Sequence, residues 1–404
     1  THTDSSAASD VYKRQMEMSK LNKKTFFIIL LSSSLVSCST FDSLRFWQND
    51  DDVDPDEPKE LLSFNEQRNI NIEWDISFNG VNDLGSFKPG FSSENLFFAD
   101  AEGNLISVQS STGKENWKKQ LNFLSSGVAS GFGILVVSDI KGNVIALNQN
   151  DGSEIWSTNV KGEVLSTAAI DPKTVVVKTG SGELIGLEKT SGETLWSYRS
   201  KLPTLTIRGS SSPVIFDNNV FVTFDNGRLG VFDINSGFLL WDGAISYVSG
   251  TSELDNLIDA DADPVVDGGL VYTTNYQGKL NIFDIAQKRS VWSYDVSSFF
   301  SPVVSRGMII VSESNSNIKS FSAKSLEESW SNEDYLNREL SNPASFKGNL
   351  VFGDFEGYLH VIDPLNGKTI GRKKISKKPI KTLFSRSNSL YAIDEAFNLF
   401  SVSI

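Results

Sequence analysis

Side chains suited to catalysis are scarce in this 404-residue chain. It contains two histidines, His2 and His360, and a single cysteine, Cys38. A Ser-His-Asp triad or a histidine metal cluster needs several such groups together, and His360 lies alone between Leu359 and Val361. No Cys-x-x-Cys-His haem motif and no Gly-x-x-x-x-Gly-Lys phosphate loop occurs in the sequence. The sequence therefore predicts a protein that is not an enzyme.

One acidic stretch, Asp259-Ala-Asp-Ala-Asp263, could suggest calcium binding. A calcium loop requires a glycine at its sixth position and a glutamate at its twelfth, where this chain has Pro264 and Leu270. We therefore expect a solvated acidic loop here, with no metal and no cofactor.

These residues are embedded in a repeat in which a glycine precedes a tryptophan by 14 residues. One repeat, Asn317/Trp330, reads one residue shorter, and another, Gly357/Gly371, lacks the indole. The glycines or their equivalents recur 39 to 51 residues apart, which is the period of a β-propeller blade. The complete pairs are Gly103/Trp117, Gly142/Trp156, Gly182/Trp196, Gly227/Trp241 and Gly278/Trp292.

The two ends of the repeat region complete each other. Phe397-Asn398-Leu399 begins a repeat without a tryptophan, and Trp74 ends one without a glycine. We therefore expect an all-β fold: an eight-bladed β-propeller of four-stranded antiparallel blades, in which the N-terminal strand joins the C-terminal blade and closes the ring. Each tryptophan should pack between neighbouring sheets. Two repeats replace the usual Gly-containing turn with Gln287-Lys288 and Leu326-Glu327, which leaves the packing of the later blades open.

The region before the ring resembles an export signal. Residues 1–15 are expected to be a sequencing or cloning artefact, followed by a start at Met16 or Met18 and a lipoprotein signal peptide over residues 16–37. Its end, Leu35-Val-Ser-Cys38, resembles the lipobox of bacterial lipoproteins, in which the cysteine is acylated. Ser39 after it favours the outer membrane, and an ordinary signal peptide with an incidental cysteine is the alternative.

An acidic tether is expected over residues 38–68, ahead of a propeller over residues 69–404. Within it, residues 49–60 carry seven acids against one lysine and include two prolines, which favours an extended chain. The formal net charge of −13 argues against a nucleic-acid partner. The basic run Arg372–Lys378 is expected to be a solvated edge that prevents strand pairing, with an anionic-lipid contact as the alternative.

Two repeat intervals are longer than the rest, at 45 and 51 residues, and the extra length lies after the tryptophan. The two insertions are residues 198–213 and 247–264. Equivalent connections of consecutive blades emerge on the same face of a ring, so the insertions should form one raised patch suited to binding a partner. Arg208 among aliphatic residues is a candidate anchor, and the alternative is surface variation with Arg208 paired internally to an aspartate.

Several motifs together resemble the BamB family of outer-membrane assembly lipoproteins. They are the lipobox, the tryptophan repeat, Leu202-Pro-Thr-Leu-Thr-Ile-Arg-Gly-Ser-Ser-Ser-Pro213, Asp225-Asn-Gly-Arg-Leu229, Gly250-Thr-Ser-Glu-Leu-Asp-Asn-Leu-Ile-Asp-Ala-Asp261 and Gly353-Asp-Phe-Glu-Gly-Tyr-Leu-His360. The resemblance covers roughly residues 35–404 and implies a non-catalytic, lipid-anchored scaffold of the β-barrel assembly machinery. Such a protein faces the periplasm from the outer membrane, binds the POTRA domains of BamA and assists delivery of unfolded β-barrel clients.

The resemblance also implies which residues bind the partner. They are Leu205, Ile207 and Arg208 of the first insertion and Asp259 and Asp261 of the second, with Cys38 as the lipidation site. The competing hypothesis is a pyrroloquinoline-quinone (PQQ) dehydrogenase, since those enzymes use the same eight-bladed, tryptophan-docked ring. They would need calcium-binding acids and longer insertions, and often a vicinal cysteine pair, which this chain lacks. The sequence identifies neither the clients nor the blade edge that would hold them.

Overall fold

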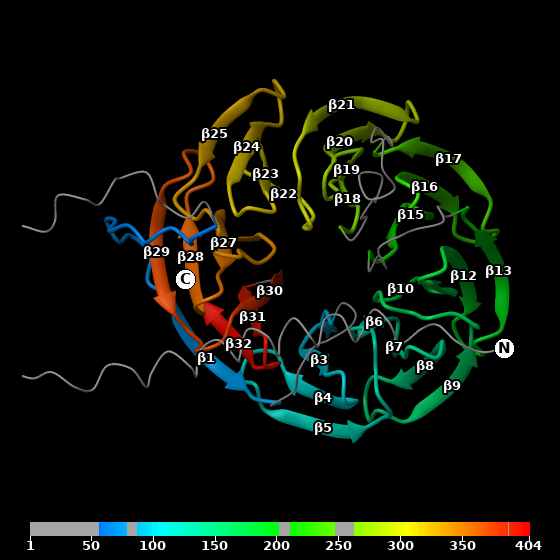
Figure 1. Ribbon diagram of the computed structural model, residues 1–404. Coiled ribbons are helices and arrows are strands. Elements are labelled where there is room, and N and C mark those ends of the chain that lie inside the picture. The colour runs from blue at the N-terminus through cyan, green and yellow to red at the C-terminus, as the bar shows by residue number, and fades with distance from the viewer. Residues whose placement is uncertain (1–55, 79–86, 202–210, 247–261, 387) are drawn as a thin grey trace, which may run out of the picture. The chain divides into compact units, whose positions relative to one another are not determined.

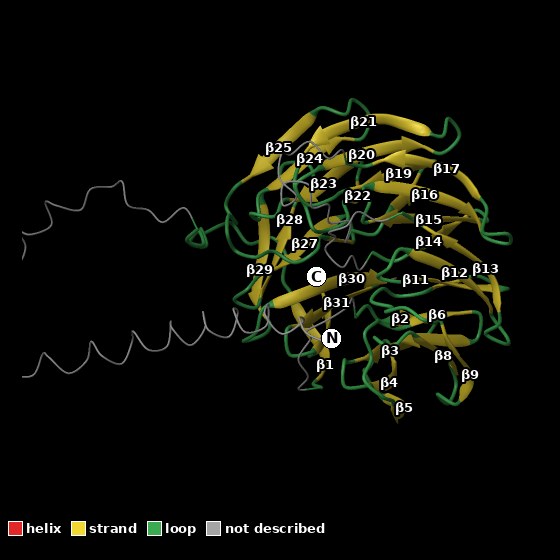
Figure 2. Ribbon diagram, turned by 45° about the vertical axis from the view of Figure 1, so that its right-hand side comes forward, coloured by secondary structure: helices red, strands yellow, loops and turns green. Residues whose placement is uncertain are grey.

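The computed structural model describes residues 56–78, 87–201, 211–246, 262–386 and 388–404. The chain divides into two units, Thr1–Pro55 and Asp56–Ile404, and all the described residues belong to the second. Every regular element among them is a strand, as the colouring of Figure 2 shows. In the part of the chain that is described, no helix is long and apolar enough to cross a membrane.

Thirty-two strands form eight antiparallel sheets of four, arranged around a ring (Figure 1). Blade 1 comprises β2 (Gly90–Phe91), β3 (Asn95–Ala99), β4 (Asn104–Gln109) and β5 (Glu115–Gln120), and blade 2 comprises β6 (Ala129–Gly131), β7 (Ile134–Ser138), β8 (Asn143–Asn148) and β9 (Glu154–Asn159). Blade 3 comprises β10 (Ala169–Ile170), β11 (Thr174–Lys178), β12 (Glu183–Glu188) and β13 (Thr194–Arg199), and blade 4 comprises β14 (Val214–Phe216), β15 (Asn219–Phe224), β16 (Arg228–Asp233) and β17 (Leu239–Ala244). Blade 5 comprises β18 (Val265–Asp267), β19 (Leu270–Thr273), β20 (Lys279–Asp284) and β21 (Arg289–Asp295), and blade 6 comprises β22 (Val303–Ser305), β23 (Met308–Ser312), β24 (Ile318–Ser322) and β25 (Glu328–Asn332). Blade 7 comprises β26 (Ala344–Phe346), β27 (Asn349–Gly353), β28 (Tyr358–Ile362) and β29 (Thr369–Lys374).

Blade 8 closes the ring with strands from both ends of the chain. Its order is β1-β32-β31-β30, where β1 is Asn71–Ile76, β30 is Ile380–Arg386, β31 is Ser389–Asp394 and β32 is Leu399–Ser403. β1 pairs antiparallel with β32, from Asn71 opposite Ser403 to Ile76 opposite Leu399. The predicted eight-bladed propeller and its mode of closure are thus confirmed. Closure removes an open edge that would otherwise expose a whole row of unpaired backbone groups.

Among the described residues, tryptophans lock five of the blades to the blade that follows. The indole nitrogen of Trp196, in blade 3, donates to the carbonyl oxygen of Ile234, in the hairpin turn of blade 4, at 2.9 Å. A Cβ on the turn glycine Gly237 would lie 2.5 Å from that indole, so the ring rests directly on the turn. The same donation is made by Trp74, Trp117, Trp156 and Trp330. The expectation that these indoles pack between sheets is confirmed.

Two hairpin turns keep their geometry without glycine. Gly113, Gly152, Gly192, Gly237 and Gly367 all have φ near +70°, and Lys288 and Leu326 occupy the corresponding positions with φ of 55° and 61°. The backbone N–H of Lys288 donates to Asp284 O at 2.8 Å, just as that of Gly237 donates to Asp233 O at 2.9 Å. The left-handed conformation costs a non-glycine residue about 1–2 kcal/mol, so these blades keep the turn at a cost in stability.

The sixth repeat is as long as the others. Ser316, not Asn317, occupies the position of the repeat glycine, because it has φ of 70° and its N–H donates to Glu313 O as that of Gly103 does to Asp100 O. Ser316 precedes Trp330 by 14 residues. The Asn317/Trp330 spacing predicted from the sequence was therefore wrong by one residue. Ser316 adopts the left-handed conformation that glycine favours, and its residue type does not indicate this.

The chain entering the ring also packs against it. The N–H groups of Gln67 and Arg68 both donate to Ile370 O of β29, and the backbone of Lys59 pairs with Leu336 O. Two residues of the basic run contact the same segment: Arg372 donates to Leu62 O and Lys373 to Ile70 O. These two side chains of the basic run, of which Lys373 is exposed, thus also hold the entering chain.

Candidate functional site

The two insertions emerge on one face of the ring. Each joins the outermost strand of one blade to the innermost strand of the next, the first between Arg199 and Val214 and the second between Ala244 and Val265. The corresponding connection from β29 to β30 takes only residues 375–379. Since equivalent connections lie at the same end of every blade, the two insertions are neighbours at the junctions around blade 4.

The residues predicted to bind the partner lie outside the described part of the chain. This applies to Leu205, Ile207 and Arg208 of the first insertion and to Asp259 and Asp261 of the second, and also to the lipidation candidate Cys38. The structure does describe the C-terminal root of each insertion, residues 211–213 and 262–264. These roots show how the two loops are held.

A buried polar network joins the two roots to each other. Thr223 of β15 accepts a hydrogen bond from Ser211 Oγ at its carbonyl oxygen, at 3.1 Å, and donates from Oγ1 to Ala262 O, at 3.1 Å. Lys178 of β11 donates to both Ser211 Oγ, at 2.6 Å, and Thr223 O, at 3.2 Å. All four residues are buried. Buried polar groups that satisfy one another hold a geometry firmly, so the two insertions leave the ring from one common base.

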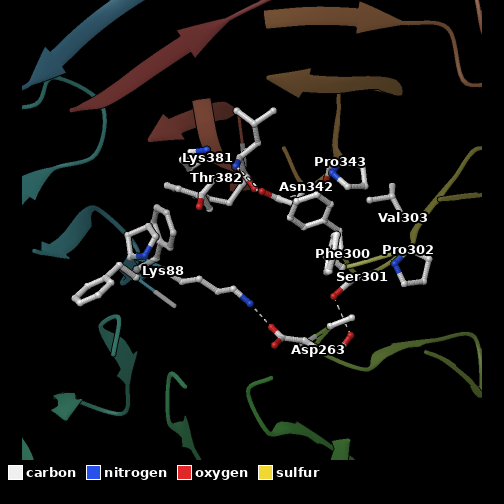
Figure 3. A pocket seen from close by; sticks show the side chains of 17 residues that line it. Lys88, Asp263, Phe300, Ser301, Pro302, Val303, Asn342, Pro343, Lys381 and Thr382 are labelled. Atoms are coloured by element: carbon white, nitrogen blue, oxygen red, sulfur yellow. Dashed lines mark hydrogen bonds and ion pairs between the residues drawn. The ribbon is translucent and has the colours of Figure 1, made fainter. Parts of the chain in front are cut away.

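Asp263 extends this base to the opposite side of the ring. Its Oδ1 accepts from the backbone N–H of Ser212 at 2.7 Å, and its Oδ2 pairs with the ammonium group of Lys88 (Figure 3). Its carbonyl oxygen accepts from Ser301 Oγ at 2.9 Å. Lys88 precedes blade 1 and Asp263 precedes blade 5, which are opposite blades of the ring. The expectation that Asp263 belongs to a solvated loop is wrong.

A cavity of about 480 Å³ lies beside this ion pair (Figure 3). Its walls come mainly from the connections before blades 1, 5, 6 and 7, which lie on the face that carries the insertions, and from β30 of blade 8. Aromatic rings and prolines dominate the lining: Phe87, Pro89, Phe91, Phe299, Phe300, Pro302, Pro343 and Phe384. The cavity is therefore apolar apart from the groups of Lys88, Asp263, Ser301, Asn342, Lys381 and Thr382.

The lining does not fit a calcium-bound quinone. Calcium prefers six to eight oxygen ligands, including several carboxylates. Among the described residues that line the cavity, Asp263 is the one carboxylate, and Lys88 and Ser212 already engage its two oxygens. Nor does any group of three or more potential metal ligands gather elsewhere in the described residues.

His360 is fully buried in blade 7 and held in one neutral form. Arg372 Nε donates to its Nδ1 at 3.1 Å, so this nitrogen must be an acceptor, and its Nε2 is 2.9 Å from Asp354 Oδ2 and therefore carries the hydrogen. Burial lowers the pKa of His360 below its usual value, despite the hydrogen bond to Asp354. Burial alone would raise the pKa of Asp354, but hydrogen bonds from His360 and Arg338 lower it. The network is structural, because its members are enclosed and paired.

Comparison with known proteins decides the family. Residues 101–332 and 291–400 match the family model described as "Outer membrane protein assembly factor BamB". A protein of that name from Yersinia pestis is 32% identical over 87% of this chain and 92% of its own length. The one from Escherichia coli strain K12 is 30% identical over 87% of this chain and 92% of its own length. The chain belongs to the BamB family.

Solved structures agree on the fold. BamB from Moraxella catarrhalis superposes with a TM-score of 0.77 at 24% identity, covering 83% of this chain and 100% of that one. A quinohemoprotein alcohol dehydrogenase from Pseudomonas putida reaches 0.64 at 9% identity, covering 83% of this chain and 76% of that one. At such identities the likeness concerns the propeller alone, so the BamB assignment rests on sequence.

Proposed function

We propose that this protein is a non-catalytic accessory subunit of the machinery that assembles β-barrel proteins in the outer membrane. It docks onto the POTRA domains of BamA through the two insertions, using Leu205, Ile207, Arg208, Asp259 and Asp261. Acylated Cys38 anchors it to the outer membrane with the ring in the periplasm, where it assists delivery of unfolded clients. The names of its relatives support the assembly role.

The observation that carries the proposal is the common base of the two insertions. A binding patch assembled from two separate loops needs those loops fixed relative to each other, since ordering them on binding would cost affinity. Ser211 and Ala262 are tied to one residue, Thr223, and Ser212 is tied to Asp263. The ring therefore supplies a shared rigid support for both halves of the proposed patch.

Charge reversal tests the patch directly. Arg208→Glu should weaken binding to purified POTRA domains by about 2–3 kcal/mol, roughly 30- to 150-fold in Kd, if Arg208 is an interface anchor. Arg289→Glu is the matched control, because Arg289 is an exposed residue of β21 whose guanidinium group donates to its near neighbour Gln287. Calorimetry on both variants and the parent measures the effect. Parent-like binding by Arg208→Glu would remove Arg208 from the interface.

Lipid attachment is tested separately from partner binding. Purified parent protein should partition into the detergent phase of a cloud-point separation, and Cys38→Ser should stay in the aqueous phase while keeping the same circular dichroism spectrum. Acyl chains add about 0.8 kcal/mol per buried methylene group, which makes the two outcomes easy to distinguish. Equal partitioning of parent and variant would contradict the anchor.

Titration with calcium and PQQ tests the competing class of function. The single engaged carboxylate of the cavity predicts no tight binding of either. Saturable binding with a submicromolar Kd would refute the scaffold proposal in favour of a quinoprotein.

A further inference from the structure

Between blades 7 and 8 the tryptophan lock is absent for a topological reason. Each locking indole rests on the hairpin turn between the third and fourth strands of the following blade. In blade 8 those two strands are β32 and β1, which belong to opposite ends of the chain, so no turn joins them. Blade 7 thus faces a blade that has no hairpin turn on which an indole could pack. Gly371 stands in its tryptophan position.

The chain leading into β1 fills this position. A Cβ on Gly371 would lie 2.6 Å from the carbonyl oxygen of Arg68 and 3.1 Å from its Cβ. The N–H groups of Gln67 and Arg68 donate to Ile370 O at 2.8 and 2.9 Å. Lys373 Nζ donates to Ile70 O at 2.8 Å, and Ile70 is 2% exposed. The backbone therefore passes directly over the glycine.

Contacts continue toward the N-terminus for a further ten residues. Arg372 stacks its guanidinium group over the ring of Phe64, 4.9 Å from its centre, and donates to Leu62 O at 2.9 Å. Leu61 packs against the hydrophobic core between blades 6 and 7. Lys59 donates from its N–H to Leu336 O at 3.0 Å. These contacts define an N-terminal strap, residues 57–70, along blade 7.

The strap is tied into the buried charges of blade 7. Arg338, whose side chain is 4% exposed, donates to Asp354 Oδ2 from Nε and Nη2, at 3.1 and 2.8 Å, and from Nη1 to Lys59 O, at 2.9 Å. Arg372 links His360 to Leu62 O in the same way. Buried guanidinium groups have donors left over after pairing with a carboxylate, and the carbonyl groups of the strap accept them.

We infer that the strap is a built-in ligand of blade 7 that replaces the missing tryptophan lock and fixes where the N-terminal tether leaves the ring. Gly371 is the residue that admits it. The arginines of the strap site act as positioning residues, and the basic run contributes Arg372 and Lys373 to it.

This exit point has a consequence that rests on the proposed function. From residue 38 to residue 57 an extended chain reaches at most about 65 Å, and freeing the strap as far as β1 would extend this to about 110 Å. The described end of the strap lies at the connection before blade 7, where Lys59 pairs with Leu336, and blade 7 is opposite blade 3 in the ring. The strap therefore sets how much free chain separates the ring from the proposed anchor.

Amide hydrogen exchange on the full chain tests the strap without any partner. In the parent, the amides of Lys59, Gln67 and Arg68 should be protected, because each is a backbone donor. Gly371→Trp places in the slot the residue that other blades carry there, and should speed exchange of these three amides at least tenfold. Gly371→Ala should have a smaller effect in the same direction. Gly180→Ala is the matched control, since a Cβ there would meet nothing closer than 3.7 Å.

The amides of β28 report whether blade 7 stays folded in each variant. Protected β28 amides together with rapid exchange at Lys59, Gln67 and Arg68 support the inference. Fast exchange of these three in the parent, or unchanged protection in Gly371→Trp with β28 intact, overturns it. If Gly371→Trp fails to fold, Gly371→Ala decides the matter by the same two outcomes. Loss of partner binding in Arg208→Glu leaves these exchange rates unchanged, so failure of the proposed function and failure of the strap are distinguishable.

Discussion

Removing the charge of Asp263 should loosen the base of the insertions more than removing its cationic partner. Asp263→Asn weakens two contacts, the ion pair with Lys88 and the charge-assisted hydrogen bond from Ser212 N–H. The side chains of Lys88 and Asp263 are 42% and 20% exposed, so solvent screens the pair and limits it to about 0.5–1 kcal/mol. The hydrogen bond to the carboxylate adds about 1–1.5 kcal/mol. The expected total is about 2 kcal/mol, against about 0.5–1 kcal/mol for Lys88→Met.

Urea unfolding of the parent, both single variants and the double variant measures these terms as a double-mutant cycle. The coupling free energy should match the cost of Lys88→Met, because that side chain makes the ion pair alone. The remainder of the Asp263→Asn cost then belongs to Ser212 and should appear as faster exchange of the Ser212 amide. Equal costs for the two single variants, with the Ser212 amide still protected, would refute the role given to Asp263 as the tie between the insertions.

Three further changes probe the ring itself. Lys288→Gly relieves a left-handed conformation at an exposed turn and should stabilise the protein by about 0.5–1 kcal/mol in urea unfolding; a destabilised variant would contradict the strain. Trp196→Phe removes the bond from its indole and should cost about 1–2 kcal/mol more than Trp292→Phe, whose indole has no such bond among the described contacts. Since the folded pKa of His360 is lowered, the unfolded chain binds the proton first, and stability should fall below about pH 6.5 by up to about 1.4 kcal/mol per pH unit; His360→Gln should flatten that slope.

Much of the fold follows from the repeat because the repeat encodes local geometry. The glycine-to-tryptophan spacing locates a hairpin and the strand after it, and both are short-range features. Such reasoning fails at Ser316 and Lys288, because the backbone there adopts a left-handed conformation although the residue is not glycine. Surrounding strands fix these turns strongly enough to override the preference of the residue.

The site was only partly predictable. Unequal repeat intervals located the insertions, since loop length can be read from the sequence directly. Their common base could not be found in this way, because Lys88 and Asp263 are 175 residues apart and meet only when the ring closes. Lys178 and Thr223 belong to ordinary strands, and nothing in their local sequence marks them as supports of a loop.

The departures of this chain from its own repeat have different causes, and this difference bears on function. Gly371 departs because ring closure removes the turn on which an indole would rest, and the strap satisfies that site within the chain. Closure requires nothing of the kind at the two junctions beside blade 4, and the lock from Trp196 is intact between blades 3 and 4. The fold therefore does not require the two long insertions there, yet a buried polar network supports their roots. Such support is expected where loops bind a partner.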